Sequence, residues 1–279
     1  MLIKLVRQTL KLVPDSVGFT ITAKLAAMTQ RPSLDERERQ AMVRAEKFRF
    51  GDGRANIAWA WGTGPLVVLV HGWSGRAAQM APLAARIAEG GFRAVAPDVT
   101  GHGDSPGKHA HWRHFIEDIP ALARTLNEDV YAYVGHSAGA LTMMAARHAG
   151  NISASRYVCI CAPSHPFPPI GVIQKKLAPR PGIVARYKAF IAEQFGSTWD
   201  ALLPGLVYQG LGANTLLFYD KTDRFVDHSE GDKLAAIAAG ARLIKTDRYS
   251  HTTILAAPEL HAAVCGFLRH ERESGHRCA

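Results

Sequence analysis

Ser137 lies in the segment GHSAG, with one glycine two positions before it and another two positions after it. Residues 130–134 predict a strand and residues 137–149 predict a helix, so the serine occupies the turn between them. Small residues are needed where backbones crowd, and a serine on such a strained turn is typical of a nucleophile. Taken alone, the same five residues would also fit an ordinary glycine-bounded turn.

A serine hydroxyl is a weak nucleophile at neutral pH and requires a base, which an acid commonly holds in place. Asp220, Asp223 and Asp227 lie close together late in the chain, and His251 follows them. A serine, an acid and a histidine that meet in space can attack a carbonyl carbon and form an acyl-enzyme. Whether these residues meet depends on the elements that carry them.

Strands and helices are predicted to alternate from residue 65 onward, which is typical of an α/β fold with a doubly wound, mostly parallel sheet. Residues 65–70 form a continuous apolar run, as expected for a strand that is buried on both faces. The predicted strands are 47–50, 56–61, 65–70, 92–97, 130–134, 156–162, 214–220 and 241–246, and the predicted helices of the core are 76–91, 111–127, 137–149, 230–240 and 258–270.

Two segments fall outside this alternation. Residues 163–212 separate two predicted sheet strands, begin with a proline-rich stretch and then become helical, so they predict a helical cap or lid inserted into the core. Residues 1–45 predict helices broken at prolines, and we expect this extension to pack on the core. The α/β core would then comprise residues 46–162 and 213–279.

Five motifs follow one another at the ends of predicted strands: HGWSG (71–75), DVTGHGDSPG (98–107), GHSAG (135–139), YDKTDRFV (219–226) and YSHTTIL (249–255). In type and order they resemble the α/β-hydrolase superfamily, in its serine hydrolase and esterase-like branch. The resemblance spans residues 65–270 apart from the inserted segment. It implies a serine nucleophile, unlike the dehalogenase and epoxide-hydrolase branches, which use an aspartate.

The resemblance assigns the acid and the base of a catalytic triad with Ser137. The superfamily places the acid three residues before a valine, as in DRFV, which points to Asp223. Asp220 ends the strand, is expected to bond the turn, and is the reserve. Asp227 replaces the proline that usually follows the valine. The base comes last in the chain order, which selects His251 over the histidines of the final helix and the tail, His261, His270 and His276.

An oxyanion needs two backbone N–H donors. The resemblance implies that Ala138, after the nucleophile, supplies one N–H of the oxyanion hole, and that Trp73, in HGWSG, supplies the other. Trp73 and His136 are also expected to bind the substrate. His71 is expected to hold its own loop by a hydrogen bond rather than to move a proton.

These assignments predict a serine hydrolase that cleaves a carboxylic ester or a related acyl substrate. The same residues would also serve an acyltransferase or a thioesterase, and a ligand-binding protein that has lost turnover is a further alternative. The apolar side chains of the inserted segment favour a small, hydrophobic acyl substrate. No cofactor and no metal is implied, since the cluster His109, His111 and His114 lacks a carboxylate or cysteine at a ligand spacing.

The formal net charge is +9, with part of the excess in residues 1–50. No block of like charges and no nucleic-acid motif accompanies it, so we do not expect a nucleic-acid partner. Residues 1–14 predict an amphipathic helix that packs on the body or, as the weaker alternative, touches a membrane surface.

Cysteine usage points to a reducing compartment. The chain has four cysteines and no C-x-x-C pattern, and its first residues include no apolar run long enough for a signal peptide, which favours a cytoplasmic location. Cys159 and Cys161 lie two apart in a predicted strand, so we expect both to point to one face as small buried residues.

Overall fold

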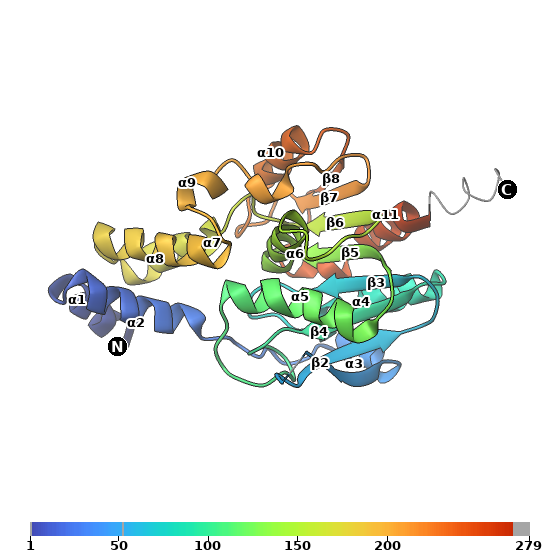
Figure 1. Cartoon of the computed structure of the whole chain (residues 1–279), viewed down its shortest axis with the longest axis horizontal. Coiled ribbons are helices and arrows are strands. Elements are labelled where there is room, and N and C mark those ends of the chain that lie inside the picture. The colour runs from blue at the N-terminus through green and yellow to red at the C-terminus, as the bar shows by residue number, and fades with distance from the viewer. Residues whose placement is uncertain (1, 52, 270–279) are drawn as a thin grey trace.

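The computed structural model describes residues 2–51 and 53–269, so His270, His276 and Cys278 lie outside the described residues. Its strands form one eight-stranded sheet with the order β1-β2-β4-β3-β5-β6-β7-β8 (Figure 1). Neighbours are parallel from β4 to β8, while β2 runs antiparallel to β1 and to β4, which confirms the expected fold class. The strands are β1 (Glu46–Phe50), β2 (Asn56–Trp61), β3 (Leu66–Val70), β4 (Arg93–Asp98), β5 (Val130–His136), β6 (Arg156–Ile160), β7 (Thr215–Asp220) and β8 (Arg242–Thr246).

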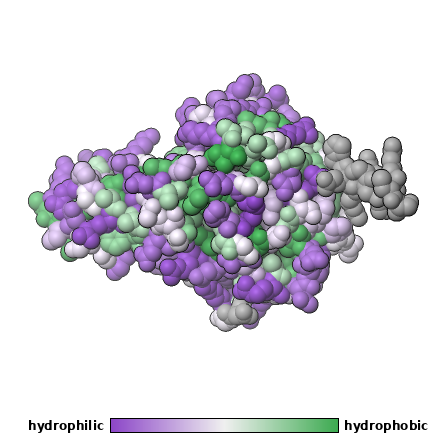
Figure 2. Space-filling model, turned by 45° about the horizontal axis from the view of Figure 1, so that its top comes forward, coloured by the Kyte–Doolittle hydropathy of each residue, from purple (hydrophilic) through white to green (hydrophobic). Residues whose placement is uncertain are grey.

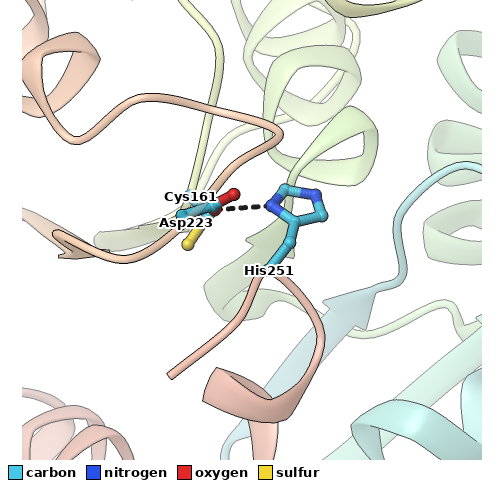
Figure 3. A group of neighbouring side chains, drawn as sticks. All are labelled: Cys161, Asp223 and His251. Atoms are coloured by element: carbon cyan, nitrogen blue, oxygen red, sulfur yellow. Dashed lines mark hydrogen bonds and ion pairs between the residues drawn. The ribbon is translucent and has the colours of Figure 1, made fainter. Parts of the chain in front are cut away.

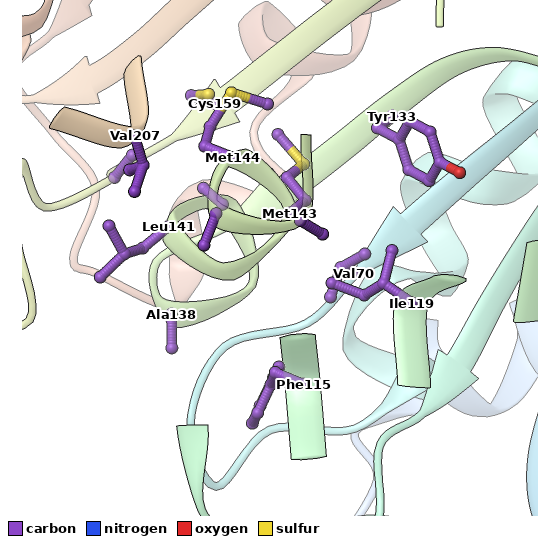
Figure 4. Packing of buried hydrophobic residues seen from close by; sticks show 14 of the residues in the cluster. Val70, Phe115, Ile119, Tyr133, Ala138, Leu141, Met143, Met144, Cys159 and Val207 are labelled. Atoms are coloured by element: carbon purple, nitrogen blue, oxygen red, sulfur yellow. The ribbon is translucent and has the colours of Figure 1, made fainter. Parts of the chain in front are cut away.

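Helices cover both faces of the sheet (Figure 1). One face packs against α5 (Trp112–Leu126), α6 (Ala138–His148) and α10 (Ser229–Ile237), and the other against α4 (Ala77–Glu89) and α11 (Pro258–Arg269). Strand β3 is buried throughout because its side chains alternate between the two hydrophobic clusters on these faces. Figure 4 shows the first of these clusters, packed around α6.

The strand order reverses beside β3, since β4 lies on one side of it and β5 on the other. In open α/β sheets the carboxyl edge at such a switch point is where ligands bind. Residues 71–75 follow β3 directly and Ser137 follows β5 directly. The topology therefore brings two of the five motifs to one edge of the sheet.

The first two helices pack chiefly on the inserted segment, and the end of α2 meets the core, where the Ala110 N–H donates to the Ala27 carbonyl oxygen at 2.8 Å. Helix α1 contacts α7 and helix α2 contacts α8, so the four helices lie together beside the sheet (Figure 1). A Cβ on Gly18 would lie 2.4 Å from Ile183 Cδ1, so this glycine permits the close approach of α2 to α8. These helices are α1 (Leu2–Leu12), α2 (Asp15–Ala27), α7 (Phe167–Leu177) and α8 (Pro181–Gln194).

We call residues 2–28 and 164–196 the helical arm. The rest of the inserted segment holds α9 (Trp199–Leu202) and a short 3-10 helix (Leu206–Tyr208). Helix α3 (Glu36–Val43) does pack on the core, against α4, and a second 3-10 helix (Thr253–Ala256) precedes α11. The inserted helices occupy the interval for which a lid was predicted, and their role as a lid stays a prediction.

Candidate active site

Ser137 lies on the turn between β5 and α6. Its φ of +52° and ψ of −117° are rarely adopted by L-residues, so the backbone is strained at this position. A Cβ at Gly135 would lie 2.5 Å from the Ala140 Cα, and a Cβ at Gly139 would lie 2.4 Å from the His71 carbonyl oxygen. Both glycines of GHSAG are therefore required by the close approach of the backbones around the turn.

His251 lies between Ser137 and Asp223. Its Nε2 is 2.9 Å from Ser137 Oγ. Its Nδ1 is 2.6 Å from Asp223 Oδ2, and Figure 3 shows this second contact. The three residues come from the segments after β8, β5 and β7, whose carboxyl ends share one edge of the sheet. With the proton on Nδ1 held by the carboxylate, Nε2 is an acceptor for the serine hydroxyl proton.

The Asp223 carboxylate is buried, and both of its oxygens accept hydrogen bonds. Oδ1 accepts from the backbone N–H groups of Phe225 at 2.7 Å and Val226 at 3.1 Å, while Oδ2 faces His251. Burial acts to raise the pKa of Asp223, but the hydrogen bond and charge of His251 and the two N–H donors outweigh it and lower that pKa. The carboxylate is therefore ionised at neutral pH, as an orienting acid must be.

The other two candidate acids accept hydrogen bonds from loop groups rather than from His251. Burial opposes ionisation of Asp220, but its hydrogen bonds prevail and lower its pKa below the usual range. Asp227 accepts from the Ser229 N–H at 2.9 Å. Of the three, Asp223 is the one that faces His251. The groups that donate to Asp220 belong to Thr222, Thr246, Arg248 and Tyr249, so this residue ties the loop after β7 to the loop after β8.

The two N–H groups proposed for an oxyanion hole lie in the loops after β3 and β5. Among the residues that the structure describes, neither the Trp73 N–H nor the Ala138 N–H donates a hydrogen bond to another protein group. The Trp73 loop is held by His71, whose Nδ1 lies 2.7 Å from the Gly72 carbonyl oxygen and whose Nε2 accepts from the Val99 N–H at 3.2 Å. Both ring nitrogens of His71 are thus used inside the protein, as expected for a structural histidine.

Trp73 and His136, the two expected substrate-binding residues, occupy different environments. The Trp73 side chain is partly exposed and stacks on Phe115 with ring centroids 5.9 Å apart. His136 is 3% exposed, and its Nε2 lies 2.8 Å from the His251 carbonyl oxygen. Burial and the neighbouring His251 lower the pKa of His136 to about 3, so its ring is neutral. His136 therefore fixes the backbone of His251, and a substrate contact stays a prediction for both residues.

Cys161 adjoins Asp223, which the sequence did not reveal. Strand β6 ends at Ile160, and Cys161 has a φ of +46°, so its side chain joins the hydrophobic cluster on the opposite face from Cys159. The expectation that both cysteines share a face is therefore wrong. The Cys161 Sγ lies within 4.8 Å of ligand atoms of Asp223 and His251 (Figure 3).

Within the described part of the chain, one group of side chains lies close enough together to hold a metal ion, and it consists of Cys161, Asp223 and His251. Burial, and then the Asp223 charge, raise the pKa of Cys161 well above its usual range, so the thiol keeps its proton. A thiol ligand must lose that proton before it binds a metal. The group therefore fits a hydrogen-bonded acid–base pair better than a metal centre.

The sequence profile of the Alpha/beta hydrolase family matches residues 67–277. This range contains all five motifs, the carboxyl edge of the sheet and the three residues that meet there. The eight-stranded sheet agrees with it. The chain belongs to the Alpha/beta hydrolase family.

Relatives of known activity include hydrolases. The monoacylglycerol lipase of Mycolicibacterium smegmatis is 28% identical over 262 residues, which cover 82% of this chain and 91% of that protein. The 2-(acetamidomethylene)succinate hydrolase of Mesorhizobium japonicum is 37% identical over 81 residues, which cover 28% of this chain and 29% of that protein. The chain thus spans less than half the length of some relatives that it matches.

Solved structures share the fold at low identity. The crystal structure of bromoperoxidase from Bacillus anthracis has a TM-score of 0.60 and 15% identity, covering 81% of this chain and 99% of that chain. At this identity the likeness establishes the fold alone. Together with the family, the relatives support an enzyme of the hydrolase type.

Proposed function

We propose that the protein is a serine hydrolase that cleaves a carboxylic ester or a related acyl compound through an acyl-enzyme. The observation that carries this proposal is the unbroken hydrogen-bonded series from Ser137 Oγ to His251 at 2.9 Å and from His251 to Asp223 at 2.6 Å. The strained turn under Ser137 adds support, because strain of this kind is characteristic of functional sites. The similarity to a monoacylglycerol lipase favours ester substrates.

In the proposed reaction, Ser137 Oγ attacks the carbonyl carbon of the substrate while its proton moves to His251 Nε2. Asp223 holds the Nδ1–H group and stabilises the imidazolium. His251 then gives the proton to the leaving alcohol as the ester C–O bond breaks, which leaves an acyl group on Ser137. Water, deprotonated by His251, attacks the acyl carbon, releases the carboxylic acid and restores the serine hydroxyl.

The negative charge of the tetrahedral intermediate would be stabilised by the N–H groups of Trp73 and Ala138. Neither group, within the described residues, has a protein acceptor, so both can donate to the oxyanion. Ala138 is the first residue of α6, where the helix dipole presents its positive end. Donors that are held in place before the reaction commonly contribute about 3–4 kcal/mol each.

Aromatic side chains beside these groups favour a hydrophobic acyl chain. The Trp73 ring packs on Trp112 at 5.4 Å, and Trp112 packs on Phe195, at the end of α8, at 5.5 Å. Phe225 is 59% exposed and stacks on His251 with ring centroids 5.4 Å apart. We therefore propose that the inserted helices act as a lid whose inner side shapes an apolar pocket.

Labelling with a fluorophosphonate probe, read by mass spectrometry, tests the proposal. We expect one adduct, on Ser137, which is absent in Ser137→Ala and unchanged in Ser153→Ala, a control at an exposed serine. The probe mimics the tetrahedral intermediate and reacts only with an activated serine. Absence of an adduct on folded protein would contradict the proposal and favour a ligand-binding protein.

A further inference from the structure

The positive charge of the molecule is concentrated in the helical arm, residues 2–28 and 164–196. The arm holds nine Lys and Arg residues and two acidic residues, a net +7, whereas the whole chain has 33 basic and 24 acidic residues, a net +9. One acidic residue, Asp15, is paired with Arg180 at 2.7 Å. Exposed basic side chains occur on all four helices and include Lys4, Lys11, Lys24, Lys175, Lys176 and Arg186.

Apolar side chains are exposed on the same arm. Among the described residues, six of the nine large apolar side chains that are exposed lie there. Leu5 and Leu12 on α1 are 60% and 84% exposed, while Leu10 on the inner side of α1 is fully buried. Figure 2 shows hydrophobic and hydrophilic side chains intermixed over the arm on the face in view. The inner face of α1 is thus covered by the arm itself, and its outer face combines leucines with lysines.

We propose that the helical arm binds the surface of a membrane that contains anionic phospholipids. None of the helices that the structure describes is both long and apolar enough to cross a membrane. A helix with basic and apolar side chains on its outer face instead lies along the interface, where the lysines meet the phosphates and the leucines enter the acyl boundary. The charge alone would suit any polyanion, and the exposed leucines select a lipid surface.

The chain offers a matched control for this proposal. Lys11 and Leu12 adjoin one another at the end of α1, and Val43 and Arg44 adjoin one another at the end of α3 on the core. Leu12 is 84% exposed and Val43 is 85% exposed. The arm variant is Lys11→Gln with Leu12→Ser, and the core variant is Arg44→Gln with Val43→Ser. Each variant therefore removes one positive charge and a similar exposed apolar area.

Co-sedimentation of the full chain with vesicles tests the proposal, using phosphatidylcholine alone and phosphatidylcholine mixed with phosphatidylglycerol. We expect binding to the mixed vesicles that weakens at high salt, because the attraction is screened. Each basic residue near the surface contributes about fivefold in affinity, so the arm variant should bind about tenfold more weakly, while the core variant binds like the parent chain. Lys4→Gln with Leu5→Ser is a second arm variant.

Three results would overturn the proposal. Equal binding to both kinds of vesicle would remove the role of the anionic lipid. Equal losses in the arm variant and the core variant would remove the role of the arm. Binding to heparin that is as tight as binding to the vesicles, and that Leu12→Ser does not change, would identify a general polyanion site. None of these results depends on catalysis, so the outcome is independent of the proposed hydrolase activity.

Discussion

The carboxyl edge of the sheet and the helical arm differ in how tightly their side chains are held. At the edge, Asp223 is buried and both of its carboxylate oxygens accept hydrogen bonds. Both ring nitrogens of His251 also have hydrogen-bond partners. On the arm, leucines and lysines are exposed over several helices. Chemistry at one carbonyl carbon requires fixed atoms, whereas attraction to a surface requires only a sum of charge and apolar area. Substitutions should therefore act steeply at the edge and gradually on the arm.

The largest effect is expected for Ser137→Ala. Removing the nucleophile should lower kcat by about 10⁶-fold, because the remaining residues cannot form the acyl-enzyme. The far-ultraviolet circular dichroism should be unchanged, since Ala fits the space of Ser. Ester hydrolysis measured on the purified variant checks this. Activity within tenfold of the parent chain would show that another group is the nucleophile.

Asp223→Asn and Asp220→Asn compare two buried acids of one loop. Asp223→Asn should lower kcat by about 10⁴-fold with little change in KM, because the amide favours the wrong histidine tautomer. Asp220→Asn should instead cost about 1–3 kcal/mol of unfolding free energy, because an amide disturbs the bonds that hold two loops together. Urea unfolding and kinetics on both variants separate the two roles. A reversed pattern would make Asp220 the acid.

Acidification should reduce the stability that Asp220 and Asp223 contribute to the fold. Both pKa values are lowered in the folded chain, so each carboxylate contributes stability above its unfolded pKa and loses it as the pH falls toward the folded value. Unfolding free energy should therefore decrease below about pH 4. Asp220→Asn should flatten this decrease, and a pH dependence equal to that of the parent chain would contradict the assignment.

Residues whose position follows from local pattern were predictable from the sequence. Ser137 is identified by its two glycines, because a Cβ at either glycine would collide with backbone. Asp223 and His251 follow strands of a parallel sheet, and carboxyl ends of such strands meet at one edge. The resemblance to the superfamily, through DRFV, pointed to Asp223 as the carboxylate that faces His251. The place of Asp220 at the end of its strand predicted that it bonds the turn, but not that it also ties the loop after β8.

Residues whose position depends on distant contacts were not predictable. The sequence placed Cys161 inside a predicted strand, but that strand ends at Ile160, just before it. The positive φ of Cys161 then turns the thiol toward Asp223. The amphipathic pattern of residues 1–14 indicated that this helix has a buried side, but not that α7 lies against α1 or that α8 lies against α2. Those partners lie in a segment far along the chain, and no local pattern encodes the pairing.

Cys161→Ala and Cys161→Ser test whether the thiol positions Asp223. Loss of the thiol beside the carboxylate should lower kcat/KM by about fivefold, since the S–H dipole no longer offsets the charge of Asp223. The acid limb of the pH–rate profile should move to higher pH, because the less neutralised carboxylate favours the protonated imidazole. Cys161→Ser keeps a donor and should restore the profile. Equal losses in both variants with an unchanged profile would show that Cys161 only fills space.

The smallest effect is expected on the arm. Lys11→Gln with Leu12→Ser should leave hydrolysis of a short, water-soluble ester within about twofold and the unfolding free energy within about 0.5 kcal/mol, as for other exposed positions. The same substitutions should reduce vesicle binding. If hydrolysis of the soluble ester also fell more than tenfold, the arm and the edge would be coupled. The contact of Phe195 with Trp112 would then be the path to examine, because Trp112 also packs on Trp73 and so joins α8 to the Trp73 loop. An unchanged rate with reduced vesicle binding would separate the two regions, with chemistry confined to the edge and surface attachment to the arm.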